Sequence, residues 1–217
     1  MQVEIWADVN CPFCYIGLAR FNKAFAAFAE ADQIEVVHRS FELDPSSPRN
    51  SSGQVVEYLA ERYGLSLEDA SQGEVRLAEQ AGAEGLDYVL SGRDFGNSFD
   101  MHRLVHFAAE TGRSEEMLNA FFHANFAEEA TLFGDPERLV QVAVGAGFDE
   151  TQVRAVVDDE NRFAQDVRDD EELALKFKIQ GVPHFVFDRY YAVSGAQPAD
   201  IFTDALTQAW ERYRGEK

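Results

Sequence analysis

Residues 3–17 read Val3-Glu4-Ile5-Trp6-Ala7-Asp8-Val9-Asn10-Cys11-Pro12-Phe13-Cys14-Tyr15-Ile16-Gly17, and two periodicities meet in them. From Val3 to Val9 apolar residues alternate with others, which is the period of a β-strand. Beyond Cys14 the apolar residues recur every three or four positions, as on one face of an α-helix. These positions are Tyr15, Leu18, Phe21, Phe25 and Phe28. The stretch therefore predicts a strand that runs into a helix beginning at the cysteines.

The expected start of this helix carries both cysteines of the chain. Pro12 suits the first helical position, where a missing N–H costs nothing and a fixed φ fits the helix. Cys11 then lies at or beside the N-cap. Two cysteines placed at random would stand three residues apart in about one case in a hundred, so the spacing is informative.

A thiol at a helix N-terminus faces unpaired N–H groups and the positive end of the helix dipole, which favour the thiolate. We therefore expect Cys11 to be the nucleophile. Cys14, one turn later, would be the resolving thiol that closes a disulfide with Cys11 and releases a mixed disulfide. Phe13 brings neither charge nor donor to the pair, which predicts a moderate rather than a strong oxidant.

The two cysteines admit two other interpretations. They could be ordinary buried residues, although the start of a helix is a poor place for a core thiol. They could also bind zinc together with His102 and His106, which stand four apart on a predicted helix. Nearly ninety residues separate the two pairs, so we predict no metal site.

The rest of the chain divides into three stretches. Residues 34–41 predict a second strand, which closes a strand–helix–strand unit of the α/β class. After a Pro- and Ser-rich loop, residues 54–178 show helical patterns only, among them a capping box at Ser66-Leu67-Glu68-Asp69. Residues 182–193 predict a hairpin, and Pro198 opens a last helix.

Composition limits the partners. The 217 residues carry 39 acidic and 19 basic side chains, for a net charge of −20, so nucleic acid and anionic membranes would be repelled. No basic segment followed by an apolar stretch opens the sequence, and no stretch is long enough to span a bilayer. We therefore expect a cytoplasmic protein with no membrane role, in which paired thiols are redox-active or bind metal.

Several motifs spread along the chain resemble the FrnE-like branch of the DsbA family of thioredoxin-fold oxidoreductases. They are Cys11 to Gly17, Arg39-Ser40-Phe41-Glu42-Leu43-Asp44-Pro45, Asn97 with His102-Arg103-Leu104, Gly181-Val182-Pro183-His184-Phe185-Val186, and Ser194-Gly195-Ala196-Gln197-Pro198. The resemblance implies an α/β, thioredoxin-like fold split by a helical insertion. The expected parts are residues 1–44 and 165–217 for the thioredoxin-like domain and residues 45–164 for the insertion.

The resemblance also implies roles for individual residues. It makes Pro183 a cis-proline facing the dithiol, whereas general statistics favour trans for X–Pro bonds. The backbone of Val182 would pair with an extended substrate segment. With Cys11 and Cys14 as catalytic residues, substrate contacts are assigned to Pro12, Phe13, Val182, Pro183 and His102. The assignment of His102 is a weaker transfer, as are those of Asn97 and Arg103, because residues 102 and 103 on a helix are as typical of a structural role.

The leading functional hypothesis is a cytosolic thiol–disulfide oxidoreductase without a cofactor. Its partners would be proteins with disulfides or thiols, or glutathione or another low-molecular-weight thiol, and it would be a monomer or homodimer. A related branch, with 2-hydroxychromene-2-carboxylate isomerases and kappa-class glutathione transferases, is the alternative, although it needs no second cysteine. A third hypothesis, a binding module, would use the helical stripe of Phe121, Phe122 and Phe126, which is more typical of a core.

Overall fold

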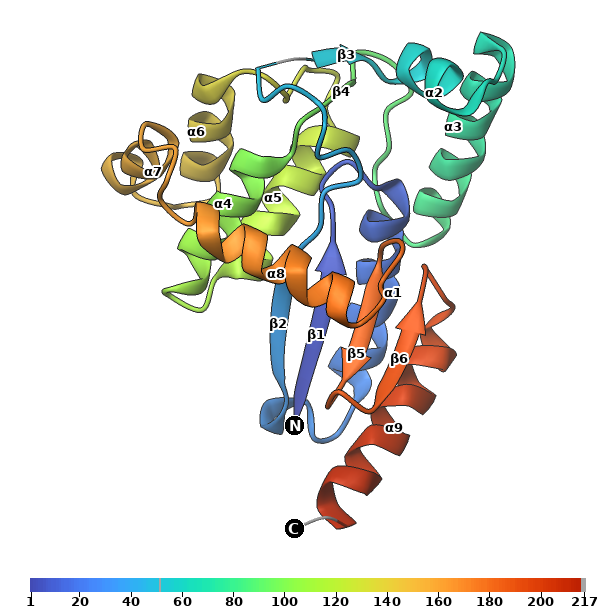
Figure 1. The fold of residues 1–217 in the computed structure, drawn as a ribbon. Coiled ribbons are helices and arrows are strands. Elements are labelled where there is room, and N and C mark those ends of the chain that lie inside the picture. The colour runs from blue at the N-terminus through green and yellow to red at the C-terminus, as the bar shows by residue number, and fades with distance from the viewer. Residues whose placement is uncertain (51, 216–217) are drawn as a thin grey trace.

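The computed structural model describes residues 1–50 and 52–215 of the chain (Figure 1). Residues 51, 216 and 217, which fall inside the expected insertion and second thioredoxin-like part, lie outside the described residues. In chain order the helices and strands are β1 (Gln2–Ala7), α1 (Pro12–Ala27), β2 (Glu35–Ser40), β3 (Ser52–Gln54), α2 (Val55–Tyr63), α3 (Leu67–Ala83), β4 (Asp94–Gly96), α4 (Phe99–Ala109), α5 (Ser114–Phe126), α6 (Pro136–Gly145), α7 (Glu150–Val157), α8 (Ala164–Lys176), β5 (His184–Phe187), β6 (Tyr191–Ser194) and α9 (Ala199–Gly215). A short 3₁₀ turn, Ala31–Gln33, precedes β2.

A four-stranded sheet of order β2-β1-β5-β6 joins the two ends of the sequence. β1 runs parallel to β2 and antiparallel to β5, and β5 and β6 form the predicted hairpin. Helices α1 and α9 cover one face of this sheet and α8 crosses the other (Figure 1). This is a DsbA-like thioredoxin fold with a helical insertion, as expected.

Helices α2 to α7, inserted between β2 and α8, lie mostly beyond one end of the sheet (Figure 1). The predicted helix start at Ser66 is confirmed, because the Ser66 side chain accepts from Asp69 N. Helix α6 starts in the same way at Asp135, whose side chain accepts from Glu137 N and Arg138 N. The domain boundaries drawn from the sequence stay a prediction.

The expectation of helices only between residues 54 and 178 was wrong. Strand β4 lies in that range and pairs with β3 as a second, two-stranded sheet. Each of these strands has three residues, too few to show a period of two. The stripe of Phe121, Phe122 and Phe126 is fully buried, which confirms the core interpretation and removes the surface that a binding module would need.

Candidate active site

The sheet itself brings the two informative loops together. Because β1 and β5 are antiparallel, with Trp6 opposite His184, the last residues of β1 and the first residues of β5 lie at the same end of the sheet. Residues 8–11 follow β1 and residues 181–183 precede β5, so both loops emerge at that end. The cysteines and Pro183, 169 or more residues apart in the chain, therefore meet.

Helix α1 begins as the sequence predicts. Cys11 is the N-cap, with φ −89° and ψ 109°, and Pro12 is the first helical residue. The Cys11 carbonyl accepts from Cys14 N at 3.0 Å and from Tyr15 N at 3.2 Å. Cys11 therefore lies at the positive end of α1.

The two thiols are free and differ in their surroundings. Cys11 is 4% exposed, and its Sγ donates to the Val182 carbonyl at 3.5 Å. Cys14 is fully buried. Burial raises the pKa of the Cys14 thiol well above its ordinary value, and a hydrogen bond with Cys11 and the charge of Cys11 raise it further. Cys14 is therefore held in the protonated form.

The Val182–Pro183 peptide bond is cis, the isomer implied by the family resemblance. Pro183 lies against α1 at Gly17, where a Cβ atom would come within 2.8 Å of Pro183 Cγ and 3.2 Å of Ala196 Cα. Both distances are shorter than ordinary van der Waals contact. Gly17 therefore permits the close approach of the Pro183 loop to the helix that carries the cysteines.

Asp8 and His102 form a buried pair in this region. His102 Nε2 lies 3.5 Å from Asp8 Oδ1, within ion-pair range but without hydrogen-bond geometry. Burial opposes protonation of the ring, but Asp8 and then Glu42 outweigh it and raise the pKa of His102 above its usual value. His102 is 2% exposed. Its assignment to substrate binding stays a prediction, and it would require His102 to act through its neighbours.

The insertion holds the loop that precedes Cys11. Asn10 Nδ2 donates to the Gly96 carbonyl at 2.7 Å, and Asn125 Nδ2 donates to the Val9 carbonyl at 2.8 Å. Leu43 N donates to Asp8 Oδ2 at 2.7 Å. The position of Cys11 thus depends on segments that are distant from it in sequence.

The weaker transfers from the family pattern have structural contacts. Asn97 Nδ2 donates to Glu42 Oε1 at 3.1 Å, and its Oδ1 accepts from Phe99 N at the start of α4. Arg103 is fully buried and donates to Asp100 and to carbonyls that include Arg162 O. Asn97 therefore links the start of α4 to the segment after β2, and Arg103 links segments within the insertion.

His106 of the zinc interpretation faces Asp170, with Nε2 3.0 Å from Oδ2. Its neighbour one turn earlier, His102, faces Asp8. Among residues 1–50 and 52–215, no three His, Cys, Asp or Glu side chains cluster as metal ligands would.

A cavity of about 360 Å³ opens beside Cys11. Pro12, Phe13 and Val182, three of the predicted substrate contacts, line it together with the nucleophile. Its far wall comes from α2, α3 and β4. The cavity therefore lies between the thioredoxin-like part and the insertion.

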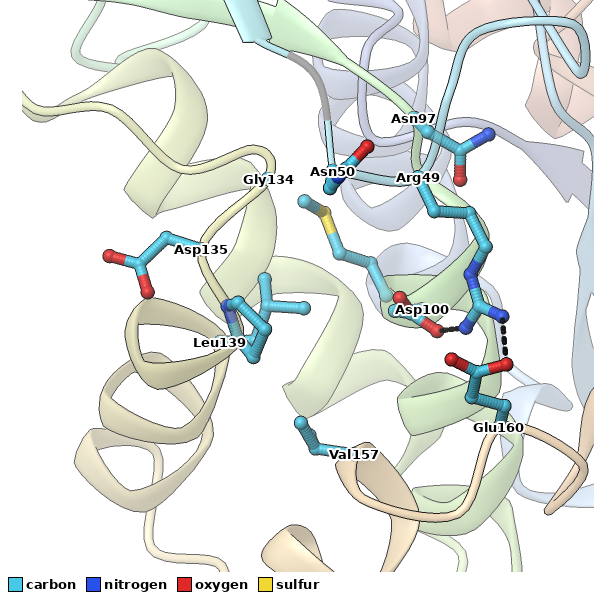
Figure 2. A pocket seen from close by; sticks show the side chains of 11 residues that line it. Arg49, Asn50, Asn97, Asp100, Gly134, Asp135, Leu139, Val157 and Glu160 are labelled. Atoms are coloured by element: carbon cyan, nitrogen blue, oxygen red, sulfur yellow. Dashed lines mark hydrogen bonds and ion pairs between the residues drawn. The ribbon is translucent and has the colours of Figure 1, made fainter.

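A second cavity of about 340 Å³ lies between α4 and α6 (Figure 2). Neither cysteine lines it. Its cation, Arg49, reaches toward Asp100 and Glu160 and forms ion pairs with both (Figure 2). This cavity therefore lacks the thiols, and its cation is already paired with acidic side chains.

Sequence reasoning missed several residues around the nucleophile. Asn10 and the cavity-lining side chains of residues 55–95 were not singled out, and Gly17 was quoted only as part of a motif. The position of Asn10 directly before Cys11 was a usable signal. The cavity wall had none, because its residues follow no shared spacing.

No helix of the described residues is long and apolar enough to cross a membrane. Among solved structures, the chain is similar to a crystal structure of a probable DsbA oxidoreductase from Streptomyces coelicolor. The two are 55% identical, the match covers 97% of this chain and 90% of that chain, and the TM-score is 0.94. It also resembles the cytosolic disulfide reductase DsbM from Pseudomonas aeruginosa, with 16% identity, 96% and 98% coverage and a TM-score of 0.65, which shows the fold alone.

Sequence comparison leads to the same family. The uncharacterized protein YwbO from Bacillus subtilis (strain 168) is 25% identical over 223 residues, which cover 95% of this chain and 96% of YwbO. The family model of the DSBA-like thioredoxin domain matches residues 2–207. The chain therefore belongs to the family of DSBA-like thioredoxin domains.

Proposed function

We propose that this protein is a thiol–disulfide oxidoreductase in which Cys11 attacks and Cys14 resolves. In the reducing direction, the Cys11 thiolate attacks a substrate disulfide, forms a mixed disulfide and releases the first substrate thiolate. Cys14 then loses its proton and attacks Cys11 Sγ, which releases the second thiolate and leaves a Cys11–Cys14 disulfide. Two electrons pass from the dithiol to the substrate, and the oxidising direction is the reverse.

The different surroundings of the two thiols are the observation that carries this proposal. Cys11 caps α1 and borders the cavity, where a substrate sulfur can approach it. Cys14 is buried with a raised pKa, so it remains a thiol while Cys11 reacts. A resolving thiol that is slow to ionise allows the mixed disulfide to form first.

Substrates in this proposal are proteins or small thiols, in the cytoplasm. An extended substrate segment would pair with the backbone of Val182, whose carbonyl is already turned toward Cys11 Sγ. The fold neighbour DsbM, a cytosolic disulfide reductase, is compatible with the compartment, and one structure of it contains GSH. Assignment to the FrnE-like branch rests on the quoted motifs and stays a prediction.

The cavity beside Cys11 supports one alternative, a glutathione-dependent isomerase or transferase. A 2-hydroxychromene-2-carboxylate isomerase has the same fold, with a TM-score of 0.70, 16% identity and full coverage of both chains. Such an enzyme would use Cys11 to engage glutathione and would not need Cys14.

Replacement of each cysteine separates the two functions. The wild type should reduce insulin or reactivate scrambled ribonuclease, and both Cys11→Ser and Cys14→Ser should abolish catalytic turnover. Activity with glutathione that survives Cys14→Ser would favour the isomerase or transferase instead. Insulin reduction and ribonuclease reactivation that are both absent in the wild type would contradict the oxidoreductase proposal.

The direction of the reaction is set by the reduction potential of the Cys11–Cys14 pair. Equilibration in glutathione redox buffers, followed by alkylation and mass spectrometry, measures it. Since Phe13 adds no charge beside the thiols, we expect a value nearer that of disulfide isomerases, about −180 mV, than the −120 mV or so of DsbA.

A further inference from the structure

The cavity beside Cys11 has an apolar wall. Phe13, Leu43, Tyr58, Leu59, Leu77 and Phe95 line it. Its volume of about 360 Å³ lies at the lower end of the range of small-molecule sites, about 300–1,000 Å³. A bulky apolar group attached near a substrate sulfur would fill this space when that sulfur reaches Cys11.

Asn10 adds a polar group to the wall, one residue before the nucleophile. It is 6% exposed, and its Nδ2 donates to the Gly96 carbonyl, which fixes the orientation of the amide. Its Oδ1 is buried and accepts no hydrogen bond from any described residue. Because an unpaired buried acceptor is costly, an N–H donor from a molecule in the cavity that reaches this oxygen would be stabilised by it.

Arg62 supplies a charge at the exposed end of α2. The other charged residues of the wall, Glu74 and Arg93, neutralise each other through an ion pair of 2.6 Å. Arg62 has no ion pair or hydrogen bond within the part of the chain that the structure describes, and Asp44, which feels its charge, is engaged by Ser46 and Tyr58.

The chain as a whole has a net charge of −20 and repels anions. The side chain of Arg62 therefore makes this cavity a place where an anionic group of a bound molecule would find a complementary charge.

We propose that this cavity selects low-molecular-weight disulfides and thiols of the N-acylated amino-thiol acid class, with a bulky apolar acyl group. The acyl group would pack against Leu59, Leu77 and Phe95, the amide N–H would donate to Asn10 Oδ1, and the carboxylate would pair with Arg62. The proposal rests on the oxidoreductase function above. The dithiol reduces the bound disulfide to two thiols and becomes the Cys11–Cys14 disulfide.

The probe is the symmetrical disulfide of N-phenylacetyl-cysteine, which has all three recognition features. Two relatives each lack one of them: diacetylcystine lacks the bulk, and the dimethyl ester of the probe lacks the charge. Rapid mixing with the reduced protein, acid quenching and mass spectrometry of the protein disulfide give a second-order rate constant for each compound. Hydroxyethyl disulfide, which lacks every feature, measures the basal reaction.

We expect the wild type to react with the probe at least about tenfold faster than with diacetylcystine or the ester, the scale at which small apolar or charged groups discriminate. Leu77→Trp, which fills the cavity, should slow the reaction of the probe at least about fivefold more than that of hydroxyethyl disulfide, and its circular dichroism spectrum should match that of the wild type, which would show that it folds. Arg62→Gln, an exposed and well-tolerated change, should slow the probe but not its ester. Leu67→Trp and Arg76→Gln, both exposed on α3 and outside the cavity, are the matched controls.

Equal rates for all four disulfides would overturn this inference and leave the oxidoreductase function in place. So would an equal effect of Arg62→Gln on acid and ester, or a peptide disulfide flanked by phenylalanine that competes with the probe at lower concentration, because the cavity would then belong to protein substrates. A wild type that reduces none of the compounds, hydroxyethyl disulfide included, would contradict the function itself.

Discussion

The two faces of the four-stranded sheet are both buried, but by different means. On the face toward α1 and α9, Phe21 is in ring contact with Phe185, Phe187 and Phe202, at centroid distances of 5.4, 6.4 and 5.8 Å. All four rings are 1% exposed or less. This face is held by apolar burial and packing, which need no partner of a particular charge.

The face toward α8 combines a small apolar cluster around Trp6 with buried charges. Glu4, 1% exposed, accepts from Arg39 at 2.7 Å and from Arg189 at 2.9 Å. Arg39 also reaches Asp170 Oδ1 at 2.9 Å, and Ser40 N donates to the other oxygen. Burial opposes ionisation of Glu4, but the two guanidinium groups outweigh it and lower its pKa.

The two faces are buried alike, but they do not tolerate substitutions alike. An apolar contact that is removed leaves a cavity, whose cost depends on how far the neighbours relax. A charge that loses its partner in the interior keeps its desolvation cost, which a second change that removes the charge can relieve. The loop that leads to the cysteines follows β1, and β1 contributes side chains to both faces of the sheet.

The largest expected effect is on the aromatic face. Phe21→Ala should lower the free energy of unfolding by about 4 kcal/mol, because it opens a cavity among three rings. Urea denaturation measures this change. Phe13→Ala on the same helix, where the ring is 46% exposed, is the control and should stay within about 0.5 kcal/mol of the wild type. A loss below about 2 kcal/mol for Phe21→Ala would show that the face is loosely packed.

On the charged face, Arg39→Met should cost about 3 kcal/mol, because Glu4 and Asp170 lose a shared partner. Adding Glu4→Leu should recover at least about 1 kcal/mol of this loss, since a buried carboxylate that keeps only the exposed Arg189 as its ion-pair partner is then gone. No second substitution that removes a side chain can recover the stability lost through Phe21→Ala in this way. Equilibrium unfolding of the double variant decides the point: a loss larger than that of Arg39→Met alone would mean that the two faces respond alike.

The sequence predicts one of these faces far better than the other. Alternation from Val3 to Val9 and the period of α1 identify the apolar side, and both belong to short, continuous stretches. The charged side is assembled from Glu4, Arg39 and Asp170, on three separate elements, so no local pattern indicates that their charges are buried together. The candidate site divides in the same way.

The residues of the cysteine motif and of the Pro183 loop were predictable, because each forms a compact motif in the chain. The cavity was not, because its wall combines α2, α3 and β4 with the thioredoxin-like part. Its shape depends on how these elements pack, and spacing within one segment carries no such information.

A smaller effect depends on pH and arises from a polar group in the sheet. His38 lies opposite Ile5 in the register of β1 and β2, its Nδ1 is buried without a hydrogen-bond partner among the described residues, and burial lowers its pKa from 6.5 to about 4. As the pH falls below 6.5, the His38 ring binds a proton in the unfolded chain before it does so in the folded protein. The contribution of the neutral ring to stability is therefore complete above pH 6.5 and is lost as the pH falls toward 4.

With allowance for contact with water, the loss should reach about 2 kcal/mol. The measurement is unfolding by urea at pH 7 and pH 4.5 for the wild type and His38→Leu. The variant should lose about 2 kcal/mol less than the wild type between the two values. His102, whose pKa is raised, has the opposite sign, because its contribution is lost as the pH rises through the folded-state pKa. Identical pH profiles of His38→Leu and the wild type would mean that the ring of His38 is solvated.

The smallest effect lies in α3, which covers neither face of the sheet but lines the cavity. The Ser66 hydroxyl accepts from Asp69 N at 3.0 Å, and Ser66→Ala leaves that N–H to water, at a cost of about 1 kcal/mol. Ser66→Thr keeps the oxygen and serves as the control. Because α3 contacts α1 and α2 rather than the sheet, we expect the loss to be local. Hydrogen exchange should then quicken about fivefold in the amides of α3 while β1 keeps its protection, whereas equal acceleration in both would mean that the cavity wall and the sheet unfold as one unit.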